Sequence, residues 1–349
     1  MNHRLPVAVL FLTSFILAHS ATTTSGDSTS TRAAFLHLID RPRVPLKPEV
    51  RTLSETNGTA KSHFTFASDT EQRVPGILLK PIQSAGRSPA VIVLHGTGGN
   101  KDSDSLRPYL EAFVNAGCVA VAIDGRYHGE RTKTGSGASE YNDANFRAYR
   151  TGKEHPFYYD TVWDVIRLID YLETRDDVDP GRIGLIGFSK GGIETYLAAA
   201  ADPRIAVAVP CIGVQSFRWG LENGQWKARV ATIQDAFDGA VKDAGVKPAN
   251  TEFVRRFYDR VVPGIYEQFD GPAMLPLIAP RPLLVINGDS DANTPLAGVR
   301  LAAEAARLAY RMARADEKFV LRIQENTGHA LTAESRDAAV EWLVRWLRN

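Results

Sequence analysis

The sequence predicts an α/β fold, in which a mostly parallel central sheet carries helices on both faces. Continuous runs of Val, Ile, Leu and Ala recur along the chain, and such runs are typical of parallel strands buried on both faces of a sheet. Segments with apolar residues at helical spacing lie between these runs, and strands that alternate with helices favour a parallel sheet. The chain shows no internal repeat, and a single domain of roughly 300 residues suits a sheet of this kind.

The first 20 residues have the pattern of a secretory signal peptide. Arg4 is their only charged side chain, residues 5–18 are almost wholly apolar, and Ala18-His19-Ser20 forms a small-x-small cleavage pattern ahead of Ala21. The apolar run is shorter than the span of about 20 residues that a membrane helix needs, and no later segment resembles a membrane span. We therefore expect residues 1–20 to be removed and the protein to be secreted or periplasmic.

Residues 21–60 are predicted to form an extended or mobile leader, because Thr22 to Arg51 is rich in Thr, Ser and Pro and has little periodicity. Asn57-Gly58-Thr59 fits the N-glycosylation pattern. Asn-Gly is also a turn signal, so both interpretations stay open. The folded domain is expected over residues 61–349.

Apolar patterning predicts the elements of this domain. An opening strand pair is expected at His63–Ala67 and Gly76–Lys80. The further strands are expected at Ala90–His95, Cys118–Asp124, Ile183–Phe188, Ile205–Cys211, Pro282–Asn287 and Lys318–Gln324. Apolar residues recur at helical spacing over Asp160–Thr174 and again over Ala339–Leu347, which predicts a helix in each segment.

The charge balance gives no reason to expect a polyanionic partner. The chain has 41 Lys and Arg against 40 Asp and Glu, and removal of Arg4 makes the two numbers equal. We therefore expect a small-molecule or polymer-borne substrate and no nucleic acid. We also expect no cofactor and no metal. Cys118 and Cys211 lie in or beside apolar runs, which favours buried free thiols over a disulfide.

A candidate nucleophile lies in Gly187-Phe188-Ser189-Lys190-Gly191. An apolar run precedes this pentad and an alanine-rich helical segment follows it, so the pentad joins a strand to a helix. A G-x-S-x-G pentad in this setting is typical of a nucleophile elbow, where flanking glycines let the strand and the helix approach closely. The alternative is that Ser189 only caps the helix that follows.

The partners of Ser189 are expected at the carboxyl ends of later strands, because that edge carries the site in open parallel sheets. His329 is the only histidine on a loop between the last strand and the last helix, which makes it the candidate base.

Two acids, Asp289 and Asp291, follow the strand at Pro282–Asn287. Thr294 and Pro295 fit the N-cap and the first position of a helix, which leaves Asp291 in the loop and free to face the site. Asp291 is therefore favoured as the triad acid, whereas Asp289 could fix the turn.

Stabilisation of an oxyanion needs backbone donors, and two positions fit. The strand at Ala90–His95 runs into the glycine-rich turn His95–Asn100, from which Thr97 would supply one N–H group, and Lys190 would supply the other. A nucleotide-binding loop is excluded because the Lys-Ser/Thr ending of a P-loop is absent from this turn.

Through these motifs the chain resembles the α/β-hydrolase superfamily, and more narrowly its dienelactone-hydrolase-like and acetyl-xylan-esterase-like esterases. The resemblance covers most of Gly76–Asn349 and includes Gly288-Asp289-Ser290-Asp291, Gly328-His329 and the turn Asp124–Gly129. It implies an α/β-hydrolase fold with the order nucleophile, acid, base, and a structural role for His95 and His128. Dienelactone hydrolases use a Cys nucleophile, so Ser189 implies ester hydrolysis and not lactone opening.

The expected function is that of a secreted serine esterase with the triad Ser189, His329 and Asp291 and an acyl-enzyme intermediate. A serine peptidase or amidase, an acyltransferase and a non-catalytic binding protein of the same fold are the alternatives. Residues 212–279 are expected to form a helical cap insertion that determines the substrate. Its many aromatic residues could line an apolar pocket or pack a small helical subdomain.

Overall fold

The computed structural model describes residues 25–348 except 84–85, 135–136 and 247–248. In this part of the chain a nine-stranded sheet has the order β1-β2-β3-β5-β4-β6-β7-β8-β9. The first three strands are antiparallel to their neighbours, and β4 to β9 pair in parallel, which confirms the predicted mostly parallel sheet. The strands are β1 (Glu49–Thr56), β2 (Thr59–Ala67), β3 (Arg73–Pro81), β4 (Ser88–Leu94), β5 (Val119–Ile123), β6 (Val178–Phe188), β7 (Ile205–Cys211), β8 (Leu283–Gly288) and β9 (Phe319–Gln324).

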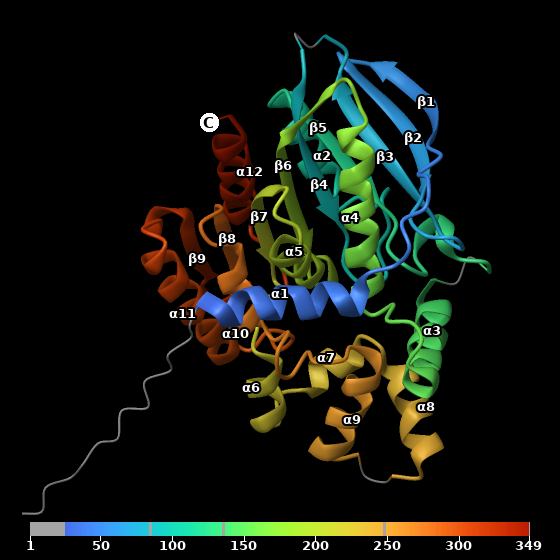
Figure 1. Cartoon of the computed structure of the whole chain (residues 1–349), viewed down its shortest axis with the longest axis vertical. Helices are drawn as coiled ribbons and strands as arrows, with labels where there is room; N and C mark the ends of the chain where they lie inside the picture. Colours follow the sequence, from blue (N-terminus) through green and yellow to red (C-terminus); the bar gives the residue numbers. More distant parts are fainter. Residues whose placement is uncertain (1–24, 84–85, 135–136, 247–248, 349) are drawn as a thin grey trace, which may run out of the picture.

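Helices cover both faces of this sheet (Figure 1). On β4, Ala90, Ile92 and Leu94 face one apolar core with α4, α5 and α11, whereas Val91 and Val93 face a second core with α2 and α12. The helices are α1 (Ser25–Ile39), α2 (Arg107–Asn115), α3 (Gly137–Thr151), α4 (Tyr159–Glu173), α5 (Lys190–Ala201), α6 (Phe217–Glu222), α7 (Lys227–Ala231), α8 (Gln234–Ala244), α9 (Thr251–Val261), α10 (Gly271–Met274), α11 (Leu296–Met312) and α12 (Ala333–Arg348).

The predicted leader over residues 21–60 is wrong for its described part, which holds helix α1 and strand β1. The physical reason is tertiary contact, since Phe35 and Ile39 of α1 are buried in the core with α4 and α5. Arg32 of α1 also donates to the carbonyl oxygens of Ala200 at 2.7 Å and Leu277 at 2.6 Å. The predicted signal peptide at residues 1–20 lies outside the described residues.

The segment predicted as the cap, residues 212–279, contains α6 to α10 and lies beyond the lower end of the sheet in Figure 1, beside α3. Most of its aromatic rings pack against one another, as Phe237 does with Phe253 and Phe257 at centroid distances of 5.6 and 5.2 Å. Seven of the aromatic side chains are buried: Phe217, Phe237, Phe253, Phe257, Tyr258, Tyr266 and Phe269. Of the two interpretations left open, packing of a helical subdomain is therefore the one the geometry supports for these rings.

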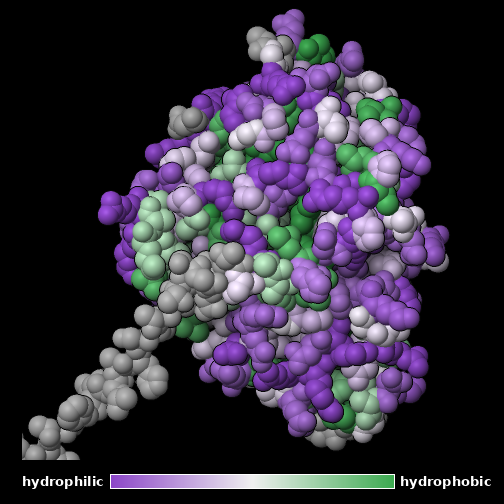
Figure 2. Space-filling model, in the orientation of Figure 1, coloured by the Kyte–Doolittle hydropathy of each residue, from purple (hydrophilic) through white to green (hydrophobic). Residues whose placement is uncertain are grey.

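Hydrophilic residues dominate the face in Figure 2, and apolar residues appear there in small groups. Cys118 and Cys211 are buried and free, as predicted. Among the described residues, no helix combines the length and the apolar character that crossing a bilayer requires.

Candidate active site

Ser189 lies at a sharp turn between β6 and α5, with φ 56° and ψ −113°. Its N–H donates to the carbonyl oxygen of Cys211 at 3.0 Å. A Cβ atom at Gly187 would lie 2.2 Å from the carbonyl oxygen of Gly191, and one at Gly191 would lie 2.6 Å from the carbonyl oxygen of Leu94. Only glycine fits at these two positions, so the sequence around Ser189 permits the elbow geometry.

Parallel strands end at one edge of the sheet, and this edge brings the predicted residues together. Ser189 follows β6, Asp291 follows β8 and His329 follows β9. His329 Nε2 lies 2.7 Å from Ser189 Oγ, and His329 Nδ1 lies 2.7 Å from Asp291 Oδ2. The Asp291 side chain is fully buried, whereas the His329 side chain is 28% exposed and Ser189 is half-buried. This is a continuous hydrogen-bonded chain from a buried carboxylate to an accessible hydroxyl.

Asp291, and not Asp289, is the acid that contacts His329. Burial acts to raise the pKa of Asp291, but hydrogen bonds from His329, from Thr294 Oγ1 at 2.7 Å and from the N–H of Asn293 at 2.8 Å hold that pKa below its ordinary value. The carboxylate is therefore ionised around neutral pH.

Asp289 has a different environment. Its exposed carboxylate accepts from the N–H groups of Asn326 at 2.9 Å and Thr327 at 3.1 Å, so it ties the loop after β8 to the loop after β9. The proposed N-cap at Thr294 is wrong by one position, because α11 begins at Leu296 and Pro295 occupies the N-cap position. Thr294 accepts from Asn287 Nδ2 and donates to Asp291, so its hydroxyl is committed to the acid.

The glycine-rich turn after β4 lies against the elbow. A Cβ atom at Gly96 would be 3.4 Å from Ser189 Cβ, so the turn that carries Thr97 passes directly beside the hydroxyl-bearing residue. Lys190 is the first residue of α5, where a backbone N–H has no acceptor within the helix. Both predicted donors thus belong to backbone next to Ser189.

His95 and His128 hold this turn through backbone hydrogen bonds. Nε2 of His95 accepts from the N–H of Gly125 at 3.0 Å, and Nε2 of His128 accepts from the N–H of Gly98 at 3.2 Å. The Nδ1 atoms lie 2.8 and 2.7 Å from the carbonyl oxygens of Gly96 and Arg126, to which they donate. An imidazole that donates through one nitrogen and accepts through the other is neutral. Burial, followed by the charge of Lys190, lowers the pKa of His95 to about 3 and that of His128 well below its ordinary value.

The side chain of Lys190 was not singled out from the sequence, which pointed only to its N–H group. Its Nζ is buried, forms an ion pair with Glu194 one turn along α5, and lies 5.9 Å from the ring centre of Tyr141. Burial raises the pKa of Glu194 to about 7, against the opposing effect of Lys190. The spacing of four residues between a basic and an acidic side chain was the available signal.

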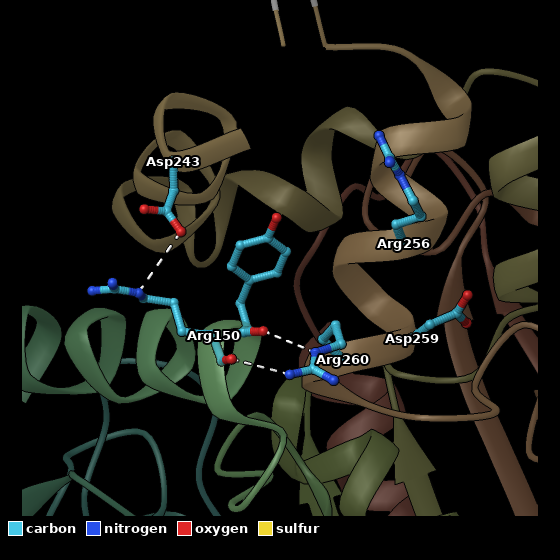
Figure 3. A pocket seen from close by; sticks show the side chains of 6 residues that line it. Arg150, Asp243, Arg256, Asp259 and Arg260 are labelled. Carbon is cyan, nitrogen blue, oxygen red and sulfur yellow. Dashed lines mark hydrogen bonds and ion pairs between the residues drawn. The ribbon is translucent and has the colours of Figure 1, made fainter. Parts of the chain in front are cut away.

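Away from Ser189, a hollow of about 480 Å³ lies between α3, α8 and α9 (Figure 3). Its lining includes Arg150, Arg256 and Arg260 with Asp243 and Asp259. Arg260 is tied to the carbonyl oxygens of Tyr149 and Arg150 at 3.0 Å each, and Arg150 reaches Asp243 at 3.7 Å. The lining holds no Ser, Cys or His and none of the residues around Ser189, so the edge of the sheet is the better candidate for ester chemistry. No group of three or more His, Cys, Asp or Glu in the described ranges is arranged to hold a metal ion.

Comparison with known proteins identifies the family of the chain. Residues 37–216 match a family model described as acetyl xylan esterase (AXE1). The Bacillus subtilis protein YtaP, to which a hydrolase activity is ascribed, is 27% identical over 316 residues, which are 87% of this chain and 94% of YtaP.

Solved structures give the same picture of the fold. Acetyl xylan esterase 1 from Thermoanaerobacterium has a TM-score of 0.66 with 20% identity, over 92% of this chain and 93% of that one. A glucuronoyl esterase from Solibacter usitatus has a TM-score of 0.61 with 15% identity, over 91% and 92% of the two chains. The predicted α/β-hydrolase fold is confirmed.

Proposed function

Because the chain belongs to the acetyl xylan esterase (AXE1) family of carboxylic ester hydrolases, we propose that it cleaves its ester through Ser189, His329 and Asp291. The observation that supports this assignment is the hydrogen-bonded chain from Asp291 Oδ2 through His329 to Ser189 Oγ, with 2.7 Å at each step. Along the chain, nucleophile, acid and base follow one another as in other hydrolases of this fold, and their side chains make the contacts that a serine hydrolase needs.

The first half-reaction forms an acyl-enzyme. His329 Nε2 takes the proton of Ser189 Oγ as that oxygen attacks the ester carbonyl carbon. It then gives this proton to the alcohol oxygen as the bond between that oxygen and the carbonyl carbon breaks. Negative charge develops on the carbonyl oxygen, and the N–H groups of Thr97 and Lys190 stabilise it. Donors that are fixed before the reaction need no reorganisation during it, which is why a turn held by His95 and His128 suits this role.

The second half-reaction hydrolyses the acyl-enzyme and regenerates the free enzyme. His329 takes a proton from water as that water attacks the acyl carbon, and then gives it to Ser189 Oγ as the bond between that oxygen and the acyl carbon breaks and the acid leaves. Throughout, Asp291 fixes the tautomer of His329 by accepting from Nδ1 and stabilises the imidazolium form.

We infer that the ester is borne on a carbohydrate. The two similar solved structures are named as an acetyl xylan esterase and a glucuronoyl esterase, and a site at which His329 is partly exposed at the edge of the sheet admits a large alcohol group. We also propose that residues 1–20 are a cleaved signal peptide, on the basis of their apolar run and the small-x-small pattern ahead of Ala21, and that the protein is secreted or periplasmic, where such polymers occur. Mature protein from the native host should begin at Ala21, and N-terminal sequencing that finds Met1 would contradict the assignment.

The activity can be tested with p-nitrophenyl acetate, acetylated xylo-oligosaccharides and an aminoacyl-p-nitroanilide. The parent protein should hydrolyse both esters and leave the anilide intact, and Ser189→Ala should lose at least about 10³-fold in kcat. Equal rates for parent and Ser189→Ala would remove the nucleophile assignment, and preferential cleavage of the anilide would favour a peptidase.

A further inference from the structure

The side chains of Lys190 and Glu194 form a buried ion pair that the proposed reaction does not use. Both residues lie on α5, one turn apart, and each is 1% exposed. Replacement of a buried ion pair by uncharged groups of similar size is often neutral or stabilising, so stability alone does not explain a pair at this position. Lys190 also follows Ser189 directly in the chain, so the pair adjoins the candidate active site.

The Lys190 ammonium belongs to the same buried cluster as the rings of His95 and His128. A Cβ atom at Gly125 would lie 3.0 Å from Lys190 Nζ and 3.4 Å from His95 Nε2, so both nitrogens face the same point of the backbone. The centres of the two imidazole rings are 5.0 Å apart. The ring of Tyr141 lies 4.6 Å from that of His128 and 5.9 Å from Lys190 Nζ. These distances join the ammonium, both imidazoles and the phenol in one group.

Two further cations act on these imidazoles, and each is balanced by an acid. Lys101 acts on the first ring and Arg131 on the second. Lys101 Nζ lies 3.0 Å from Asp124, Arg131 Nη1 lies 2.6 Å from Asp164, and both carboxylates are fully buried. Neither cation therefore faces the rings without its counter-charge.

The charge of Lys190 is balanced less completely. Burial raises the pKa of its partner Glu194 to about 7, so this carboxyl takes up a proton around neutral pH and then no longer neutralises the ammonium. Tyr141 adds no charge, because its hydroxyl donates to the carbonyl oxygen of Phe157 at 3.0 Å. In mildly acidic solution the cluster thus holds a positive charge beside Nε2 of His95, where a further proton is unfavourable.

A further proton would matter because both Nε2 atoms act as acceptors. That of His95 accepts from the N–H of Gly125, and that of His128 accepts from the N–H of Gly98. A protonated Nε2 would face these N–H groups as donor against donor, and the hydrogen bonds would be lost. The two rings hold the turn after β4 only while they are neutral.

The ring of His95 also determines where the proposed oxyanion donor points. Its Nδ1 atom donates to the carbonyl oxygen of Gly96 at 2.8 Å. That carbonyl and the N–H of Thr97 belong to one planar peptide unit, so the direction of the first sets the direction of the second. On the other side of Thr97, the N–H of Gly98 bonds to His128. Loss of these ring contacts would free the Thr97 N–H to turn.

We propose that the Lys190 side chain is a positioning residue, whose ammonium keeps His95 and His128 in the neutral form that holds the turn carrying Thr97. Glu194 holds the ammonium in place and accepts the first proton that enters the cluster. The inference rests on the proposed function, since it assumes that Thr97 stabilises the oxyanion of an ester. It adds that the charge beside the nucleophile keeps this turn in order in mildly acidic solution.

The test replaces the pair by uncharged groups in the double variant Lys190→Met/Glu194→Gln. Glu194→Gln alone is the matched control, because it keeps the ammonium. Nitrogen NMR shifts of the imidazoles, assigned with His95→Gln and His128→Gln, report whether each Nε2 bears a proton. In the parent and the control both rings should stay neutral down to about pH 5. In the double variant at least one ring should take up a proton about one pH unit or more above the parent.

The second measurement is kcat for the release of acetate from p-nitrophenyl acetate, expressed as the ratio of the double variant to the parent. The ratio removes the pH dependence that the two proteins share. It should fall by about tenfold or more between about pH 8 and about pH 5.5, whereas KM should change little, because the oxyanion forms only as the ester is attacked. The control should show no such fall.

The outcomes separate the positioning role from a structural one. Rings that stay neutral at pH 5 in the double variant would overturn the proposal, as would a control that behaves like the double variant. A loss of kcat that is equal at both pH values would leave the pair a structural role only and would also overturn it. Turnover that survives Ser189→Ala would instead overturn the catalytic assignment and leave the NMR result unaffected. If the control does not fold, the double variant against the parent decides.

Discussion

The backbone of Ser189 combines a positive φ of 56° with an extended ψ of −113°, a conformation that residues with a Cβ atom rarely adopt. Backbone strain of this kind costs about 1–3 kcal/mol and is maintained by surrounding structure. Here the strain lifts the hydroxyl out of β6 toward His329, and the N–H bond to Cys211 helps to hold it.

Ser189→Gly should therefore stabilise the fold by about 1 kcal/mol or more while it abolishes esterase activity. Ser189→Ala is the matched control, because it removes the same hydroxyl and keeps the strained Cβ. Urea unfolding measures both. A glycine variant no more stable than the alanine variant would show that the turn carries little strain.

The two aspartates of the loop after β8 allow a paired experiment. Asp291→Asn should lower kcat by about 10⁴-fold, because an amide favours the wrong tautomer of His329. Asp289→Asn should change kcat little, since Asp289 contacts only Ser290 and the backbone of the loop after β9. Steady-state kinetics on p-nitrophenyl acetate decides between them, and a larger loss for Asp289→Asn would reverse the assignment.

Helix α1 packs the start of the described chain against α4, α5 and α10, near the lower end of the sheet in Figure 1. Phe35 is fully buried and meets Tyr159 and Phe269 edge-on, each at a centroid distance of 5.1 Å. Phe35→Ala should destabilise the protein by about 3–5 kcal/mol through lost contacts and a cavity. Leu36→Ala, at a neighbouring and partly exposed position, serves as the control and should cost much less. Equal unfolding midpoints for the two variants would mean that α1 contributes little.

The contrast between α1 and the strands shows what patterning can predict. Strands such as β4 and β7 are continuous apolar runs, so composition alone reveals them. Helix α1 has no marked amphipathic pattern, and β1 is exposed along its whole length, so both depend on tertiary contacts that periodicity does not encode.

The same limit applies to the candidate site. The elbow and the loop histidine follow from turn chemistry and chain order, and Asp291 from its place in the loop. The buried partners of these residues do not follow in this way. Thr294 was expected to cap a helix, whereas its hydroxyl accepts from Asn287 and donates to Asp291, and a capping pattern does not show which of these near neighbours the side chain binds.

For the whole molecule, the buried histidines predict how stability depends on pH. His95 and His128 are neutral in the fold, and burial holds their pKa values below the ordinary value of 6.5, to about 3 for His95. Between these values the unfolded chain binds protons that the folded chain does not, so the free energy of unfolding falls as the pH drops below 6.5. At pH 5 the loss is about 2 kcal/mol for His95, at 1.36 kcal/mol per pKa unit, and His128 adds to it in the same direction.

Paired carboxylates such as Asp164, whose pKa Arg126 and Arg131 hold low against the effect of burial, lose their contribution only at more acidic pH. Burial raises the pKa of Glu194 to about 7 and that of Asp270 to about 6, so these carboxyls take up protons in the fold between pH 7 and pH 5 and oppose the loss. The contribution of the histidines is therefore the difference between the parent and the double variant His95→Gln/His128→Gln in urea unfolding. The variant should be weaker at pH 7, and between pH 7 and pH 5 the parent should lose more stability than the variant. Parallel pH profiles would contradict the prediction. The same histidines tie the turn after β4 together through the N–H of Gly98 and fix it to the loop after β5 through the N–H of Gly125. The proton uptake that weakens the fold should therefore also disorder the turn that we propose to stabilise the oxyanion.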